Sequence, residues 1–277
     1  MIIIQSILLG IIQGLTEFIP VSSTAHLLIA QRLIGWQNPT PQQSSFIFIF
    51  IVLVQLGTVL ALIIYFKKEL YQIIRITLTS LWNKKPFAEP QARLGWFLIL
   101  ATIPAGISGI LFKPLVEQLF KNPLLEAFIR LSMTAVLLLI AEKIGQHNRV
   151  LDSLNWKDAL WIGCAQVLSI FPGVSRSGTT IAGGMTRQFV RPAAARFSFL
   201  MSIPVMLLAG LYEMRDVFNI QGMISYLPAI LAGFITAAIV GYLSIRWLLT
   251  FLARSPLYIF IIYCATLSLL ILIAMVI

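Results

Sequence analysis

Charged residues are scarce in this chain, since only 11% of its 277 residues are Asp, Glu, Lys or Arg. In a soluble domain about a quarter of all residues are charged, so a fully water-exposed globular protein is excluded. Apolar residues make up 59% of the chain. This balance predicts an all-α integral membrane protein that crosses the bilayer several times.

Cysteine and histidine are also rare, with two of each. Cys164 and Cys264 lie in apolar runs, fit no metal-binding spacing and give no grounds for a disulfide. Of the two histidines, His147 lies in a polar segment and is expected to be solvated. The first basic residue is Arg32, so the N-terminal region lacks the basic start and small-residue cleavage site of a signal peptide, and no cleaved leader is expected.

Acidic residues are half as common as basic ones, which leaves a formal net charge of +10. The Lys and Arg residues are dispersed among the connecting segments and are not gathered in one domain. Nucleic acid is therefore excluded as a partner. The pattern favours basic cytoplasmic loops that orient membrane helices.

Six apolar segments approach or exceed the roughly 20 residues that a membrane crossing needs. They are residues 46–66, 94–112, 124–141, 197–212, 223–245 and 257–277. Residues 67–93, 142–157 and 187–196 between them are polar and are predicted to be loops.

Four other apolar pieces are too short to cross, and they occur as two pairs. Residues 2–12 and 25–33 flank one polar break, and residues 158–171 and 181–186 flank another. Irregular backbone at membrane depth is tolerated only where protein or a water-filled cavity covers it. We therefore predict that each pair forms a re-entrant helical hairpin.

The two breaks resemble each other, which indicates an internal repeat. Residues 13–27 read QGLTEFIPVSSTAHL and residues 166–180 read QVLSIFPGVSRSGTT. Aligned without a gap, they share Gln13/Gln166, Leu15/Leu168, Phe18/Phe171, Val21/Val174 and Ser22/Ser175.

The basic segment 67–93 sets the orientation of the repeat when it is placed in the cytoplasm. The halves, residues 1–141 and 142–277, then have opposite topology, and each is a re-entrant hairpin followed by three spans. The predicted fold is one membrane domain, residues 1–277, built as an inverted repeat. In such folds the site lies where the broken helices meet, near the membrane middle.

The first break gathers polar side chains that are costly at membrane depth. Gln13 and Glu17 are four residues apart and share a helix face. Four more polar residues follow them: Ser22, Ser23, Thr24 and His26. A lone buried carboxylate must be neutral or lie near a cation. The break is thus either a metal or proton site, or a kinked helix in which hydroxyls and backbone satisfy Glu17.

The second break combines glycines and hydroxyls with an arginine: Gly173, Ser175, Arg176, Ser177, Gly178, Thr179 and Thr180. Backbone N–H groups at a helix start, hydroxyls and a guanidinium favour an anion. Arg176 needs a negative partner in its apolar surroundings, either Glu17 or a bound phosphate. An ion pair that only joins the halves leaves the many hydroxyls unexplained, whereas phosphate oxygens use them. Together the breaks predict hydrolysis of a phosphate ester or diphosphate on a lipid.

The stretches GLTEFIPVSSTAH and PGVSRSGTT closely resemble the two signature motifs of the undecaprenyl-diphosphate phosphatase family, the bacitracin-resistance proteins. The resemblance covers essentially the whole chain. It implies a multi-pass enzyme of the bacterial plasma (inner) membrane that converts undecaprenyl diphosphate to undecaprenyl phosphate and phosphate. Such an enzyme recycles the lipid carrier of cell-wall synthesis and confers bacitracin resistance. The resemblance also implies a divalent metal, Mg²⁺ or Ca²⁺, and an active site that opens to the outer face.

The resemblance also implies roles for individual residues. The catalytic residues would be Glu17, Ser23, His26 and Arg176. Glu17 would hold the metal, with Gln13 where family members also have Glu. The substrate-binding residues would be Ser22, Thr24, Gly173, Ser175, Ser177, Gly178 and Thr179. We expect Ser23 to be the nucleophile, with His26 as base or as acid for the leaving phosphate. Metal-activated water without a covalent step is the alternative.

Two other functions fit parts of the sequence: transport, and the reaction of type-2 phosphatidic-acid phosphatases. Inverted repeats with broken helices are also a transporter architecture, so a transporter or flippase for a phosphorylated anion is the alternative. Type-2 phosphatidic-acid phosphatases are disfavoured because the chain has no Pro-Ser-Gly-His stretch. The expected partners are a polyprenyl diphosphate lipid and the lipid bilayer, and a homodimer is left open.

Overall fold

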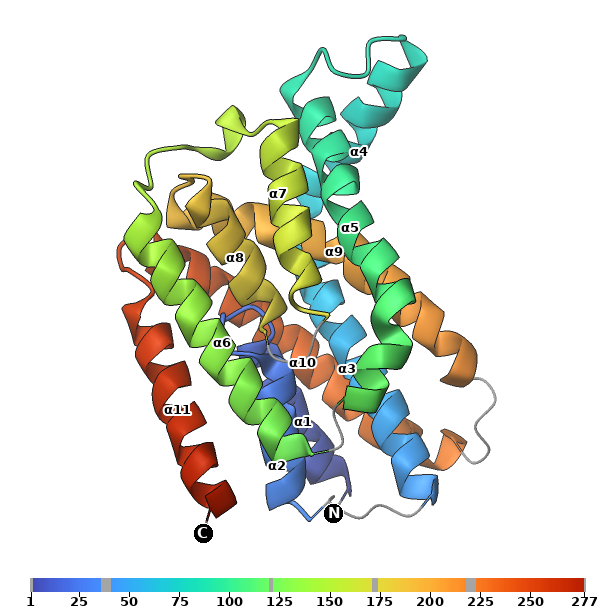
Figure 1. Ribbon diagram of the computed structural model, residues 1–277. Coiled ribbons are helices and arrows are strands. Elements are labelled where there is room, and N and C mark those ends of the chain that lie inside the picture. Colours follow the sequence, from blue (N-terminus) through green and yellow to red (C-terminus); the bar gives the residue numbers. More distant parts are fainter. Residues whose placement is uncertain (1, 36–40, 120–121, 171–173, 218–222, 277) are drawn as a thin grey trace.

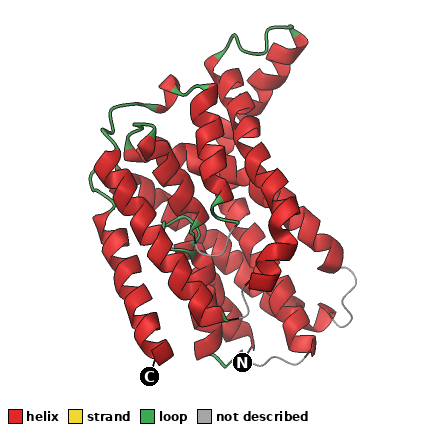
Figure 2. Ribbon diagram, viewed as in Figure 1, coloured by secondary structure: helices red, strands yellow, loops and turns green. Residues whose placement is uncertain are grey.

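The computed structural model describes residues 2–35, 41–119, 122–170, 174–217 and 223–276. Over these ranges the chain forms a bundle of eleven α-helices and one short 3-10 helix (Figures 1 and 2). The α-helices are α1 (Ile2–Thr16), α2 (Ser23–Leu33), α3 (Pro41–Tyr65), α4 (Lys67–Trp82), α5 (Pro90–Leu119), α6 (Pro123–Ile144), α7 (Trp156–Val167), α8 (Arg176–Thr186), α9 (Arg191–Val217), α10 (Met223–Leu252) and α11 (Tyr258–Val276). The 3-10 helix, η1, is Leu151–Ser153. The all-α prediction is confirmed.

Six helices in the described part of the chain are long and apolar enough to cross a membrane, namely α3, α5, α6, α9, α10 and α11. They coincide with the six apolar segments predicted from the sequence, which confirms a multi-pass membrane protein. Several of them run past the predicted ends. Hydropathy marks only the apolar part of a helix, whereas its backbone hydrogen bonds continue into polar residues.

The remaining apolar helices form two short pairs, α1 with α2 and α7 with α8. In each pair the two helices pack against each other. Helix α1 and helix α7 begin at opposite ends of the bundle, and the turns that follow them lie near its middle (Figure 1). The irregular stretch in each pair is shorter than the predicted break, because α8 begins at Arg176 and not at residue 181, and α2 begins at Ser23 and not at residue 25.

Three segments predicted to be loops are partly helical, and residues 142–157 include the end of α6, η1 and the start of α7. Helix α4 occupies residues 67–82, where Ile73 and Thr77 are buried and lie beside Gly95 of α5. Its charged residues, Lys67, Lys68, Glu69 and Arg75, suggested a loop. Helix α9 already begins at Arg191, because Glu142 neutralises that residue at the start of the helix.

The connector between the halves is anchored by Asp158, which is fully buried in the first turn of α7. Its carboxylate accepts hydrogen bonds from Arg149 at 2.6 Å and Arg187 at 2.7 Å, and from the Asn155 N–H. Burial raises the pKa of Asp158, but these hydrogen bonds outweigh burial and hold the pKa below its ordinary value. The connector is therefore tied to both α7 and the end of α8.

The prediction that His147 is solvated was wrong. Both ring nitrogens are buried, and neither has a hydrogen-bond partner among the described residues. The polar sequence around His147 gave no sign that the connector folds back on the bundle. The backbone N–H groups of Asn148 and Arg149 donate to the Gln188 carbonyl, which draws the connector against the turn after α8.

Glycines let α1 pack closely on α10. A Cβ atom added to Gly10 would lie 2.6 Å from the Gly233 carbonyl oxygen, and one added to Gly14 would lie 2.8 Å from the Gly241 nitrogen. The spacing of Gly10 and Gly14 is the small-xxx-small pattern by which membrane helices approach each other. The close contact sets the depth at which α1 ends, and thus the position of Glu17.

We expect Gly14→Ala to destabilise the protein by about 1–3 kcal/mol, because the new methyl group overpacks the α1–α10 contact. Gly106→Ala in α5 is the matched control, since a Cβ there meets nothing within 4 Å. The control should be neutral, or stabilised by up to roughly 1 kcal/mol through helix propensity. Thermal unfolding of both variants in detergent measures the difference, and equal melting temperatures would contradict the close packing.

Candidate active site

Glu17 lies at the centre of the site, in the turn directly after α1. One carboxylate oxygen, Oε2, accepts hydrogen bonds from Gln13 Nε2 at 2.8 Å and Ser23 Oγ at 2.7 Å. The other, Oε1, accepts from Arg176 Nη2 at 2.6 Å. The Glu17 side chain is only 7% exposed, so its charge is satisfied by protein groups. The two breaks meet at this carboxylate, as the sequence predicted.

Arg176 is the first residue of α8 and reaches Glu17 from the other half of the chain. Its Nη1 is buried and has no hydrogen-bond partner among the described residues. A buried charged donor without a partner is costly. Bound anions are the usual occupants of such a position beside a helix N-terminus.

The start of α8 is held by Ser175 and Ser177. Ser175 Oγ accepts a hydrogen bond from the Gly178 N–H at 3.1 Å and thereby caps the helix. The Ser175 N–H donates to Thr134 Oγ1 of α6 at 3.0 Å, and the Ser175 and Ser177 hydroxyls lie 3.1 Å apart. Ser177 Oγ also donates to the Ile19 carbonyl of the first break at 3.4 Å. The N-terminus of α8 is thus fixed next to Glu17.

Three other residues of the second break were predicted to bind substrate: Gly178, Thr179 and Gly173. A Cβ atom on Gly178 would lie 3.0 Å from Ser175 Cβ, so the cap favours glycine there. Thr179 is buried, and its hydroxyl donates to the Arg176 carbonyl of its own helix at 2.8 Å. That hydroxyl is committed to the backbone. Gly173 lies outside the described residues.

His26 is held by two contacts that set its tautomer. Its Nδ1 lies 2.8 Å from the Ser22 carbonyl, and its Nε2 lies 2.7 Å from the Tyr263 hydroxyl of α11. A carbonyl can only accept, so Nδ1 carries the proton of the neutral ring and Nε2 accepts from Tyr263. None of the hydrogen bonds in the described residues joins His26 to Ser23. The hydroxyl of Ser23 instead faces Glu17.

Ser22 itself has a positive φ of 68°, which is uncommon for a residue with a side chain. This backbone conformation turns the Ser22 carbonyl onto His26. Strained backbone of this kind clusters at functional sites. Thr24, the next residue but one, is exposed on the first turn of α2.

Two residues that contact the site, Tyr263 and Thr134, were missed by the sequence argument. Tyr263 orients His26, and Thr134 holds the backbone of Ser175. Both lie in apolar helices at ordinary span positions, and Tyr263 is 237 residues from His26 along the chain. No motif or spacing in the sequence identifies either of them.

The oxygens near Glu17 were tested for their fit to a metal ion. The described residues contain no group of three or more His, Cys, Asp and Glu side chains that could hold one. Glu17 is, however, joined by Gln13, whose buried Oε1 has no partner among those residues. A carboxylate with one further oxygen suits Mg²⁺, which protein sites usually bind by one or two carboxylates together with substrate phosphates.

Comparison with known proteins identifies the family of the chain. The family model described as bacitracin resistance protein BacA matches residues 6–270. A relative from Myxococcus xanthus (strain DK1622) is 39% identical over 99% of this chain and 89% of its own length. Relatives from Chlorobium phaeobacteroides and Chloroherpeton thalassium are 41% and 39% identical over 95% and 94% of this chain, and over 93% and 92% of their own lengths. All three are named undecaprenyl-diphosphatase. The chain belongs to the bacitracin resistance protein BacA family.

Proposed function

We propose that this protein hydrolyses undecaprenyl diphosphate to undecaprenyl phosphate and phosphate, and thereby recycles a lipid carrier of cell-wall synthesis. The names of its relatives supply the substrate. The observation that carries the proposal is the Arg176–Glu17 contact at 2.6 Å, in which Arg176 Nη1 has no partner within the described part of the chain. A phosphate oxygen would satisfy that donor.

The second break would bind the diphosphate. Arg176 offers its Nη1, which has no partner among the residues that the structure describes, and the capped N-terminus of α8 adds the positive end of the helix dipole. Ser177 would contribute its hydroxyl, which lies 3.1 Å from the Ser175 hydroxyl and makes a long 3.4 Å bond to the Ile19 carbonyl. These donors lie next to Ser23 because Glu17 contacts both Ser23 and Arg176.

Ser23 is the proposed nucleophile. Its hydroxyl attacks the terminal phosphorus, and the bond from that phosphorus to the bridging oxygen breaks. Glu17 accepts the Ser23 proton because it is the base in contact, at 2.7 Å; of the two roles that the sequence left open for His26, base or acid, this leaves the acid. His26 then has the role of proton donor to the leaving undecaprenyl phosphate, for which its Nε2 must first take up a second proton in place of the hydrogen bond that it accepts from Tyr263. Water hydrolyses the phosphoserine and releases orthophosphate.

A divalent metal, Mg²⁺ or Ca²⁺, is proposed as cofactor. Glu17 and Gln13 Oε1 would hold it, together with phosphate oxygens. Such an ion, when bound, neutralises charge on the phosphate oxygens and on the leaving group. Arg176 would also neutralise charge on the phosphate oxygens.

We also propose that residues 1–141 and 142–277 are inverted repeats within one membrane domain. The short helix pairs α1–α2 and α7–α8 support this, since they enter from opposite ends of the bundle and meet at Glu17 and Arg176 (Figure 1). The basic α4 segment would lie in the cytoplasm, and the site would open to the outer face of the inner membrane.

Purified protein in detergent should release orthophosphate from a polyprenyl diphosphate, and EDTA should abolish the release. Glu17→Gln should lower the rate by at least about 100-fold, because it removes the anion that faces the metal, Ser23 and Arg176. Phosphate release is read colorimetrically, with a melting curve to confirm that the variant is folded. Unchanged substrate with folded wild-type protein under every metal tried would favour the transporter alternative.

Ser23→Ala should lose nearly all activity if the covalent step is correct. Rapid quenching of the wild-type reaction with ³²P-labelled substrate should trap phosphate on Ser23, identified by peptide mass spectrometry. Ser169→Ala is the matched serine control, since the Ser169 hydroxyl donates to the Gln166 carbonyl and Ser169 is not among the proposed site residues. Full incorporation of solvent oxygen into phosphate without any protein adduct would refute the nucleophile and support metal-activated water.

Tyr263→Phe should lower kcat by about 2- to 10-fold, because one hydrogen bond to His26 is worth roughly 0.5–1.5 kcal/mol. The pH–rate profile should shift, since the hydroxyl that contacts Nε2 is lost, while KM changes little. Tyr258→Phe on the same helix is the matched control, because the two side chains are 45% and 44% exposed. Identical profiles for wild type and Tyr263→Phe would exclude this positioning role.

A further inference from the structure

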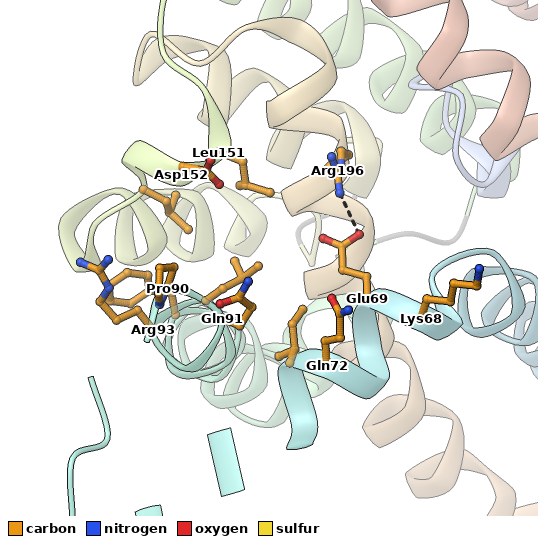
Figure 3. Close-up of a pocket in the computed structure, with 13 residues that line it drawn as sticks. Lys68, Glu69, Gln72, Pro90, Gln91, Arg93, Leu151, Asp152 and Arg196 are labelled. Carbon is orange, nitrogen blue, oxygen red and sulfur yellow. Dashed lines mark hydrogen bonds and ion pairs between the residues drawn. The ribbon is translucent and has the colours of Figure 1, made fainter. Parts of the chain in front are cut away.

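A second polar region lies far from Glu17, where two cavities of about 410 and 510 Å³ share the lining residues Lys68, Glu69 and Arg196. The first cavity lies between α4, α5, η1 and α9 (Figure 3). The second lies beside the end of α3 and is also lined by α10 residues. We call these two cavities together the boundary pocket. None of the proposed catalytic residues lines it.

The boundary pocket is positively charged. Its basic lining residues are Lys67, Lys68, Arg93 and Arg196, and its acidic lining residues are Glu69 and Asp152. Arg196 Nη2 of α9 donates to Glu69 Oε2 of α4 at 2.9 Å, and Figure 3 shows this ion pair. Among the described residues, no other residue that lines the pocket forms a salt bridge. Lys67, Lys68 and Arg93 are thus available to an anion.

The pocket also lies at the end of a membrane span. The apolar span in α3 ends at Tyr65, and Lys67 and Lys68 follow directly. Tyr65 packs edge-on against Tyr242 of α10 at 5.6 Å between ring centroids. Tyrosines at a span end, followed by lysines, are typical of the level of lipid headgroups.

The walls of the second cavity change from apolar to basic. Ile64 is exposed on the α3 side and Leu249 lines the α10 side. Lys67, Lys68 and Arg196 line the same cavity. A free anion would use only the basic part, whereas a lipid would also place its acyl chains along the apolar part.

The outer surface of helix α4 also favours contact with lipid. Four large side chains, Tyr71, Ile74, Leu78 and Trp82, recur at helical spacing, and each is more than half exposed. An exposed apolar stripe on a helix rich in basic residues is the pattern of a helix that lies in the membrane interface. This stripe favours lipid as the neighbour of the boundary pocket.

We propose that the boundary pocket binds the phosphate of an anionic glycerophospholipid headgroup. Lys67, Lys68 and Arg196 bind the phosphate oxygens, and the acyl chains follow Ile64 along the outside of α3. Glu69 limits the affinity because it competes for Arg196. This site is separate from the proposed phosphatase reaction, and its test does not depend on catalysis.

The test measures binding to purified, delipidated protein in detergent. Native mass spectrometry counts retained lipid, and thermal unfolding reports stabilisation by a bound ligand. The probes are short-chain phosphatidylglycerol, phosphatidylcholine of the same chain length, and inorganic phosphate. We expect phosphatidylglycerol to bind at least tenfold more tightly than phosphatidylcholine. Equal binding of the two lipids would overturn the proposal, and phosphate that binds as tightly as phosphatidylglycerol would overturn the lipid assignment.

Paired variants locate the site. Lys67→Gln/Lys68→Gln should weaken phosphatidylglycerol binding about tenfold or more, whereas Lys84→Gln/Lys85→Gln should change it less than about twofold. Both variants remove two charges from the same segment, but only the first pair lines the pocket. Glu69→Gln should tighten binding because it frees Arg196. Equal weakening by the two double variants would show that overall charge, and not this pocket, attracts the lipid, and melting without lipid checks that each variant is folded.

Discussion

The arrangement of the site depends on one ion pair, between Glu17 of the first break and Arg176 of the second. Burial of two charges costs more than a single contact returns unless further hydrogen bonds support them. Gln13 and Ser23 supply those bonds to Glu17, whereas one nitrogen of Arg176 has no partner among the described residues. This asymmetry supports the proposal that a substrate phosphate binds at Arg176.

The surrounding helices act by fixing the two ends of that pair. Gly10 and Gly14 let α1 approach α10 closely and thereby set where α1 stops. On the opposite side, Thr134 of α6 holds the backbone at the start of α8. Tyr263 of α11 holds His26 at the edge of the site. Long apolar helices, whose sequences say only that they cross a membrane, therefore supply the contacts that orient the reactive groups.

The helical class and the six spans could be predicted because hydropathy over about 20 residues is a strong physical signal. The breaks could be predicted because polar groups at membrane depth are costly. Helix α4 was missed, since its buried face is narrow and its charges suggest a loop. The solvated state predicted for His147 was wrong, because local polarity does not reveal how a connector folds back on the bundle.

The sequence by itself determined which residues are candidates for the chemistry: a carboxylate, a serine, a histidine and an arginine in two similar breaks. Only the tertiary structure decided how they are paired. Ser23 contacts Glu17 and not His26, and His26 is oriented by a tyrosine from the last helix. The physical reason is that hydrogen bonds require atoms within about 3 Å. Residue order can indicate that two segments meet, but the packing of the helices between them sets distances on that scale.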